Sequence, residues 1–335
     1  MLKYLGSKRR LVPRIVALID AMPRVRSVID LFSGSARVAH ALKGAGYQLF
    51  TNDHNQYAHT VALGVVQADA EVHAARVERE LRALASAAPV DGWFTQRYAR
   101  DARFFHPENA ARIEGVREAI ARAGYGPELE AALLTALIQA ADRVDSTTGV
   151  HMAYLKAWAP RALLPLELRE PRLLPRAAAG KARALGLDAL AAAQRLSADV
   201  AYLDPPYNQH SYLGNYHLWE TLVRWDAPEV YGVAQKRVDV KARTSRFNSR
   251  PKFAEALTEV VRTVDARTLV LSFSDEGFVD RAWITALLEE RGPVKCITVA
   301  HPRYVGARIG IHDPRGRRVG RVSHVTNREY LFVVG

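Results

Sequence analysis

The fold of this chain is decided by the stretch Val28-Ile-Asp-Leu-Phe-Ser-Gly-Ser-Ala36. Residues 28–32 are apolar and begin with β-branched side chains, which is typical of a buried strand. Gly34 follows in a tight turn, and residues 36–45 have a helical pattern. Residues 48–51 predict a second strand. Because a strand, a helix and a second strand make a βαβ unit, the sequence predicts a parallel sheet.

The chain between residues 54 and 183 has a different pattern from the segments on either side. Its expected helices lie at 71–87, 109–123 and 128–144, with no clear strand between them. The sheet pattern resumes after residue 184, with strands expected at 199–203, 268–273, 294–299 and 330–334, the last ones antiparallel. We therefore expect an α/β domain formed by residues 1–53 and 184–335, with a largely helical insertion at 54–183.

The composition favours a polyanionic partner. The 335-residue chain carries 47 Lys+Arg against 35 Asp+Glu, a net charge of +12, and this surplus favours nucleic acid over an acidic membrane. Cys296 is the only cysteine, which excludes an internal disulfide and a cysteine-based metal cluster, and we expect no bound metal. No apolar run reaches about 18 residues and the basic start does not resemble a signal peptide, so we expect a cytoplasmic protein.

Three candidate ligand sites follow strands, and ligands of open α/β sheets bind outside the carboxyl ends of the strands. The first, at residues 30–36, offers a glycine turn and a helix N-terminus. It has no Gly-x-Gly-x-x-Gly and no Gly-Lys-Ser/Thr, so a dinucleotide or nucleoside triphosphate site is poorly supported. The second, Asp53, can accept hydrogen bonds from a ribose diol or cap the next helix. Each site also suits an ordinary loop, and the sequence leaves both alternatives open.

The third site, Asp204-Pro205-Pro206-Tyr207, gives the strongest indication of function. The two prolines end the strand and carry no N–H. The turn therefore offers a carboxylate and carbonyl groups, all of them hydrogen-bond acceptors, beside the aromatic face of Tyr207. This combination suits a planar group with an exocyclic NH2, such as the edge of adenine or cytosine. The alternative is a proline turn without a ligand.

Five motifs occur in order along the chain, namely Lys3-Tyr-Leu-Gly-Ser-Lys8, Asp30-Leu-Phe-Ser-Gly-Ser35, Asn52-Asp53, Asp188-Ala-Leu190 and Asp204-Pro-Pro-Tyr207. The series resembles the Dam-type (D12 class) DNA adenine methyltransferases, which use S-adenosylmethionine. The resemblance implies a Rossmann-like, mostly parallel methyltransferase sheet, with the insertion as the target-recognition domain. Ala36 departs from the pattern, since the family often has a glycine there, and its methyl group would crowd the cofactor slightly.

The resemblance also implies roles for individual residues. Tyr4 and Lys8 would contact the methionine end of the cofactor, Asp53 its ribose hydroxyls and Asp188 its adenine moiety, while Asp204 would lie between the cofactor and the target amine. The residues expected to bind the cofactor are Tyr4, Lys8, Asp30, Phe32, Gly34, Asp53, Asp188 and Asp204.

The implied reaction is methyl transfer to an exocyclic amine, whose lone pair is delocalised into the base. Hydrogen bonds from the amine to the Asp204 carboxylate and the Pro205 carbonyl would draw it toward tetrahedral geometry and stabilise the developing positive charge. The base would be flipped out of the duplex and stacked on Tyr207, with Tyr212 and Tyr216 either stacking too or packing beside Trp219. The catalytic residues expected are Asp204, Pro205, Pro206 and Tyr207.

Positive charge is concentrated at residues 1–26, 236–252 and 303–321 with few acids, which favours contacts with DNA phosphates. Residues 313–316 are expected to form a hairpin tip, and base recognition is expected from the insertion and from residues 208–250. The DNA-binding residues expected are Lys236, Arg237, Lys241, Arg243, Arg246, Arg250, Arg315, Arg317 and Arg318.

The residue chemistry leaves the target open between adenine N6, which the resemblance favours, and cytosine N4. An RNA methyltransferase on the same frame and a DNA-binding module that has lost its cofactor are further alternatives. The expected partners are double-stranded DNA and a cognate restriction endonuclease, and we expect the protein to be a monomer.

Overall fold

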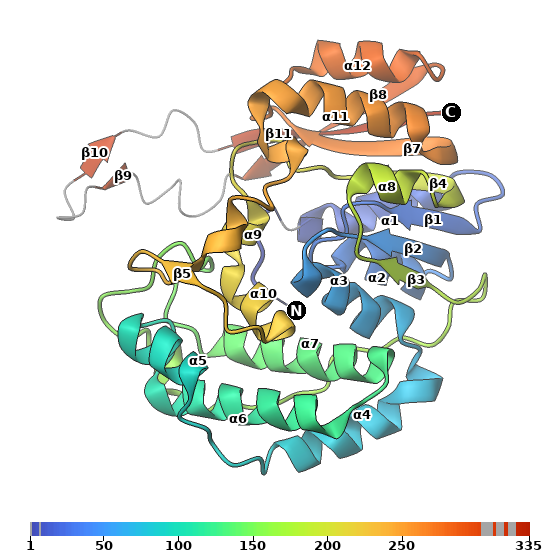
Figure 1. Ribbon diagram of the computed structural model, residues 1–335. Helices are drawn as coiled ribbons and strands as arrows, with labels where there is room; N and C mark the ends of the chain where they lie inside the picture. The colour runs from blue at the N-terminus through green and yellow to red at the C-terminus, as the bar shows by residue number, and fades with distance from the viewer. Residues whose placement is uncertain (1, 7, 303–310, 313–317, 321–325) are drawn as a thin grey trace.

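The computed structural model describes residues 2–6, 8–302, 311–312, 318–320 and 326–335. Its main sheet has seven strands in the order β3-β2-β1-β4-β7-β11-β8 (Figure 1). The first five pair in parallel, and β11 runs antiparallel to β7 and β8. This confirms the expected mostly parallel α/β fold. The strands are β1 (Ser27–Asp30), β2 (Gln48–Asn52), β3 (Arg183–Leu185), β4 (Ser197–Leu203), β7 (Asp265–Ser274), β8 (Val294–Pro302) and β11 (Thr326–Val334).

The predicted βαβ unit is formed by β1, α2 (Arg37–Gly44) and β2. Strand β1 lies between β2, which follows it in the chain, and β4, which comes much later. The strand order therefore reverses at β1. In doubly wound sheets this is the place where a ligand crevice forms.

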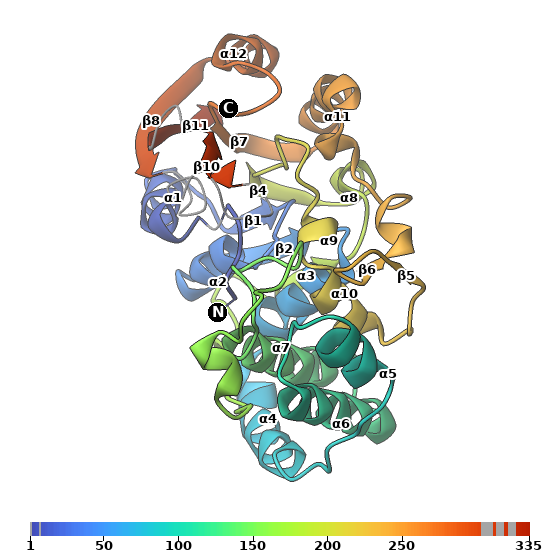
Figure 2. The ribbon, with the colours of Figure 1, turned by 90° about the vertical axis from the view of Figure 1, so that its left-hand side faces the viewer.

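Alternate side chains of the sheet enter two separate cores, as the period of two in a strand requires. Val28, Val200 and Val270 belong to one core, and Ile29 and Ala201 to the other. The first face is covered by α1 (Val12–Asp20) and α2, and the second by α8 (Ala189–Ala193), α11 (Arg250–Thr263) and α12 (Arg281–Glu289) (Figures 1 and 2).

The segment at 54–183 is helical where the sequence predicted helices, and α4 to α7 form a layer at one end of the molecule (Figure 1). Its apolar side chains, among them Phe94, Ile113 and Leu137, join the core of the first sheet face, together with Trp219. The division into two domains stays a prediction. The helices of the segment are α3 (Gln56–Ala62), α4 (Ala70–Leu84), α5 (Trp93–Thr95), α6 (Pro107–Ala123) and α7 (Pro127–Arg143), with π-helical turns at Leu63–Gln67 and Gln96–Asp101. The helices α9 (Tyr212–Asn215) and α10 (His217–Arg224) follow β4.

Two short antiparallel hairpins extend from this frame. One pairs β5 (Val230–Tyr231) with β6 (Lys236–Arg237), and the other pairs β9 (Ile311–His312) with β10 (Arg318–Gly320). The expected tip at 313–316 lies outside the described residues. Within the part of the chain that the structure describes, no helix is long and apolar enough to cross a membrane. Single 3-10 turns occur at η1 (Lys8–Arg10), η4 (Pro160–Leu163), η5 (Val238–Val240) and η6 (Arg246–Asn248).

Candidate functional site

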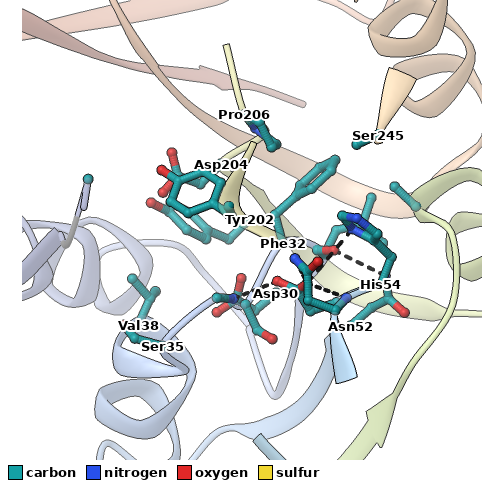
Figure 3. A pocket seen from close by; sticks show the side chains of 18 of the residues that line it. Asp30, Phe32, Ser35, Val38, Asn52, His54, Tyr202, Asp204, Pro206 and Ser245 are labelled. Carbon is teal, nitrogen blue, oxygen red and sulfur yellow. Dashed lines mark hydrogen bonds and ion pairs between the residues drawn. The ribbon is translucent and has the colours of Figure 1, made fainter. Parts of the chain in front are cut away.

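The carboxyl ends of β1, β2 and β4 meet at one cavity. It encloses about 830 Å³ of space, part of it open to solvent. Figure 3 shows Asp30 and Phe32 from the end of β1, Asn52 and His54 from the end of β2, and Asp204 from the end of β4 around it. All eight residues expected to bind the cofactor line this cavity, namely Tyr4, Lys8, Asp30, Phe32, Gly34, Asp53, Asp188 and Asp204.

Asp53 is held in a fixed orientation at the end of β2. One carboxylate oxygen accepts a hydrogen bond from the Gly34 N–H at 2.9 Å. The other accepts from the backbone N–H of Asn55 at 2.9 Å and from its side-chain amide at 3.0 Å. Each carboxylate oxygen has two acceptor sites, so the three bonds fill Oδ1 and leave one site, on Oδ2, for a ligand in the cavity.

The turn after β1 contains two residues with a left-handed φ, Gly34 and Ala36. Gly34 has a φ of +49°, and a Cβ on it would lie 3.2 Å from the Tyr4 ring. Ala36 also has a positive φ, +56°, and is the N-cap of α2. Its side chain is buried in the core and does not line the cavity. The expectation that its methyl group crowds the cofactor is therefore wrong.

Tyr4 forms part of an aromatic stack on one wall. Its ring lies between those of Tyr212 and Tyr216, with centroids 5.3 and 4.8 Å away and nearly parallel planes. Its hydroxyl lies 3.1 Å from that of Tyr57. Tyr212 lines the cavity, and Tyr216 is buried in the core, where Trp219 also packs. The stack fixes Tyr4 in place.

Lys8 forms an ion pair with the aspartate of the proline motif. Its Nζ lies 3.1 Å from Asp204 Oδ1 and 3.1 Å from Glu329 Oε2, and its side chain is only 6% exposed. Burial raises the pKa of Asp204 to about 6, while Lys8 lowers it and Glu329 raises it. Burial opposes the charge of Lys8, but the two carboxylates hold the pKa of its ammonium well above its usual value. Glu329 is not among the residues predicted from the sequence, where the only indication of it is a carboxylate next to the apolar stretch 330–334.

Asp30 is a buried carboxyl at the base of the cavity. Burial is the largest cause that raises its pKa, to about 8, and the charges of Asp204 and Asp53 add to it, against hydrogen bonds from the backbone of Ala39 and Phe32. Its Oδ1 has no hydrogen-bond partner among the described residues. A buried polar atom without a partner is unusual in a native protein, and because Asp30 lines the cavity, this atom can accept or donate a hydrogen bond there.

The remaining motif residues lie around the cavity in different ways. Phe32 packs edge-on against Phe247, with ring centroids 5.0 Å apart. Asp188 caps α8 by accepting a hydrogen bond from the Leu190 N–H at 3.0 Å, and it also lines the cavity.

In the proline motif, Asp204 and Pro206 line the cavity, whereas Pro205 and Tyr207 are not among its lining residues. The Tyr207 ring packs against Phe273, with centroids 5.5 Å apart. The structure thus brings two of the four expected catalytic residues to the cavity wall.

Three of the expected DNA-binding arginines are paired with carboxylates. Arg237 is 1% exposed and binds Asp226 at 2.6 Å and Asp239 at 2.9 Å. The expectation that it contacts phosphate is wrong, because a buried and doubly paired guanidinium cannot reach DNA. Arg243 and Arg246 are less buried, but they too are neutralised: Arg243 pairs with Glu220 and Asp239, and Arg246 with Glu255 and Glu259. Free phosphate contact is therefore not expected from either.

The other expected basic residues have different surroundings. No described carboxylate forms an ion pair with Lys236, Lys241 or Arg250. Lys241 lies over the ring of Tyr231 at 5.1 Å, and Arg250 over that of Phe278 at 5.8 Å. Arg315 and Arg317 lie outside the described residues, and Arg318 begins β10.

The chain is similar to several type II modification enzymes. It is 27% identical to modification methylase StsI of Streptococcus sanguinis over 305 residues, which cover 86% of this chain and 46% of that protein. It is 28% identical to the type II methyltransferase M.FokI of Planomicrobium okeanokoites over 87% of this chain and 47% of that protein. The chain therefore spans about half the length of these two relatives.

A third relative has the same extent as this chain. The type II methyltransferase M.NlaIII of Neisseria lactamica is 25% identical over 341 aligned positions, which cover 98% of this chain and all of that protein. The family model for D12 class N6 adenine-specific DNA methyltransferases matches residues 4–280, a span that includes the cavity at the ends of β1, β2 and β4. The chain belongs to the D12 class N6 adenine-specific DNA methyltransferase family.

Proposed function

We propose that this chain transfers a methyl group from S-adenosylmethionine to the N6 amine of an adenine that is flipped out of duplex DNA. The observation that carries the proposal is a single cavity lined by Asp53 and Asp204 on the two sides of the point where the strand order reverses. Asp53 is an oriented acceptor suited to a ribose diol, and Asp204 is an acceptor suited to an amine. Membership of the family supports adenine as the target.

The lining of the cavity suits this cofactor. Buried polar atoms of Asp30, Ser33 and Asn55 that have no partner among the described residues belong to side chains of the cavity wall. Asp30 keeps its proton at neutral pH because its pKa is about 8, and the other three acidic side chains of the wall still outnumber Lys8 and Arg37, which favours a ligand with a positively charged centre. When bound, S-adenosylmethionine supplies a methyl group activated by a sulfonium. The acidic side chains of the wall are Asp30, Asp53, Asp188 and Asp204.

Within this proposal, Asp53 binds the ribose hydroxyls, Asp188 lies at the adenine end, and Phe32 packs against the ligand. Lys8 lines the cavity, but its ammonium is bound by Asp204 and Glu329. We therefore assign Lys8 to holding Asp204 in place of the methionine contact that the resemblance implied.

The chemical role of Asp204 is to accept a hydrogen bond from the target amine. Its pKa of about 6 leaves it ionised at neutral pH, and an ionised carboxylate is the stronger acceptor. The Pro205 carbonyl is the proposed second acceptor. Two acceptors placed beforehand stabilise the positive charge that develops on the nitrogen as the new bond forms.

The hairpin β5–β6 is the proposed element that contacts DNA. Val233 at its turn is 75% exposed and Tyr231 is 39% exposed. Lys236 pairs with Tyr231 in the hairpin, and Lys241 lies over the Tyr231 ring. Apolar side chains flanked by cations are suited to entering a groove and unstacking a base step. We further propose that residues 54–183 serve as the target-recognition domain, that the protein acts as a monomer, and that a cognate restriction endonuclease is its partner.

Sequencing of modified DNA tests the proposed function. DNA from a methylation-free host that expresses this chain is expected to carry N6-methyladenine in one sequence context, and DNA from a host that expresses Asp204→Ala is expected to carry none. Methylation of cytosine N4 would overturn the choice of base. A wild-type protein that folds and methylates RNA in place of duplex DNA, or methylates nothing, would overturn the proposal itself.

A further inference from the structure

Two cations line the cavity, and they differ in whether the protein neutralises them. Lys8 is bound by Asp204 and Glu329. Arg37 lies between this cavity and a second, smaller one and lines both, and no described carboxylate forms an ion pair with it. A ligand that carries an anionic group and enters this cavity therefore meets one cation whose charge is still available.

The guanidinium of Arg37 is partly buried, but its N–H groups lack good hydrogen-bond acceptors. Its Nε is buried and has no hydrogen-bond partner among the described residues. Its Nη2 donates to the Leu2 carbonyl only at 3.5 Å, the limit of a hydrogen bond. Burial lowers the pKa of Arg37, and the positive charge of Arg9 lowers it further. An anion that binds next to this partly buried and unpaired cation would lower its free energy.

The backbone favours an anion at the same place. Arg37 is the first residue of α2, and the first N–H groups of a helix have no acceptor within the helix. The positive end of the helix dipole adds to this field. Ser35 and Val38, which flank Arg37, also line the cavity, and Figure 3 shows both at the start of α2.

We propose that Arg37 binds the α-carboxylate of the amino-acid part of the cofactor, and that this contact lets the protein select ligands that carry that carboxylate. The inference rests on the proposed function, because it takes S-adenosylmethionine as the ligand. It assigns to Arg37 the anionic end that the resemblance assigned to Tyr4 and Lys8. The Tyr4 ring is stacked between two tyrosines, and the Lys8 ammonium is already paired with two carboxylates. Arg37 is therefore the cation that we assign to the ligand carboxylate.

Calorimetric titration with two ligands tests the assignment. The ligands are S-adenosylmethionine and its decarboxylated form, which differ only in the carboxylate. Wild-type protein is expected to bind S-adenosylmethionine about 10- to 100-fold more tightly, the range of a charge-assisted hydrogen bond. In Arg37→Met the affinity for S-adenosylmethionine is expected to fall while that for the decarboxylated form stays at its wild-type value, so the preference shrinks to the part that the N-terminus of α2 supplies. Arg37→Lys is expected to keep part of the preference.

Arg172 provides a matched control, because it lies in a second, smaller cavity with Arg37 but does not line the first one. Arg172→Met is expected to keep the wild-type preference. An unchanged preference in Arg37→Met would overturn the inference while leaving the proposed function intact. A folded wild-type protein that binds neither ligand would overturn the proposed function. If Arg37→Met does not fold, Arg37→Gln replaces it. The test is then the ratio of its affinities for S-adenosylmethionine and the decarboxylated form.

Discussion

The Nζ of Lys8 lies 3.1 Å from the Oδ1 of Asp204, which joins the 3-10 turn near the start of the chain to the carboxyl end of β4. Glu329 on β11 binds the same ammonium at 3.1 Å. The acceptor proposed for the target amine is therefore held from two distant parts of the sequence. Its charge state depends on a cation that is itself shared between two carboxylates.

Replacement of Lys8 by Met is expected to move the pH dependence of methyl transfer. Burial raises the pKa of Asp204 to about 6 even with Lys8 present, so wild-type kcat/KM should fall as the pH decreases through about 6. Without the cation the pKa rises further, by about one unit or more, and the fall should begin at a higher pH. Lys8→Arg keeps the charge and should keep the wild-type profile. Identical profiles for Lys8→Met and the wild type would refute the role of Lys8.

Asp30 is expected to make the ligand-free protein less stable as the pH rises. Its pKa is about 8 in the folded protein against about 3.9 in an unfolded chain. Between these values the native state holds a proton that the unfolded state has released. The free energy of unfolding should therefore fall from about pH 4 to pH 8, by up to about 1.4 kcal/mol per unit from this group, and then level off.

Urea unfolding across this pH range measures the effect. Asp30→Asn cannot titrate and should flatten the decline, whereas Asp265→Asn, at an exposed position of β7, should leave it unchanged. An equal slope in Asp30→Asn and the wild type would show that Asp30 is already ionised in the native protein.

Gly34→Ala is expected to destabilise the protein and to weaken cofactor binding. A left-handed φ costs an alanine about 1–2 kcal/mol, and the new Cβ would lie 3.2 Å from the Tyr4 ring, which Tyr212 and Tyr216 prevent from moving. Ala36→Gly is the matched control. It relieves the strain of a similar left-handed φ but removes a buried methyl group worth about 0.8 kcal/mol. The net change in the free energy of unfolding should therefore be within about 1 kcal/mol. Thermal melts compare the two, and a neutral Gly34→Ala would contradict the close contact.

The sequence predicted the strands and the cavity wall well, because the chemistry follows the ends of parallel strands. Asp30, Asp53 and Asp204 each come directly at or after a short apolar run, and parallel pairing brings such ends to one edge of the sheet. Knowing the strands was therefore enough to place these residues near one another.

Contacts that depend on strand register or on side-chain pairing could not be predicted from the sequence. Glu329 reaches Lys8 only because β11 runs antiparallel to β7 and places Glu329 opposite Ser274. Arg237 was misjudged because the sequence shows the sign of a charged segment but not its partners. The turn between β5 and β6 brings Arg237 back to Asp226, and Asp239 lies on its other side.

This distinction between paired and unpaired cations predicts which residues control DNA affinity. Lys241 has no ion pair with a described carboxylate, whereas Arg246 is neutralised by Glu255 and Glu259. Each phosphate contact adds nearly one unit to the slope of log K against log salt. Lys241→Ala should therefore weaken binding to all DNA sequences and reduce the slope by about one. Arg246→Ala should leave the slope unchanged. Fluorescence anisotropy on one duplex over a salt series measures both, and a larger loss of slope in Arg246→Ala would mean that its ion pairs open when DNA binds.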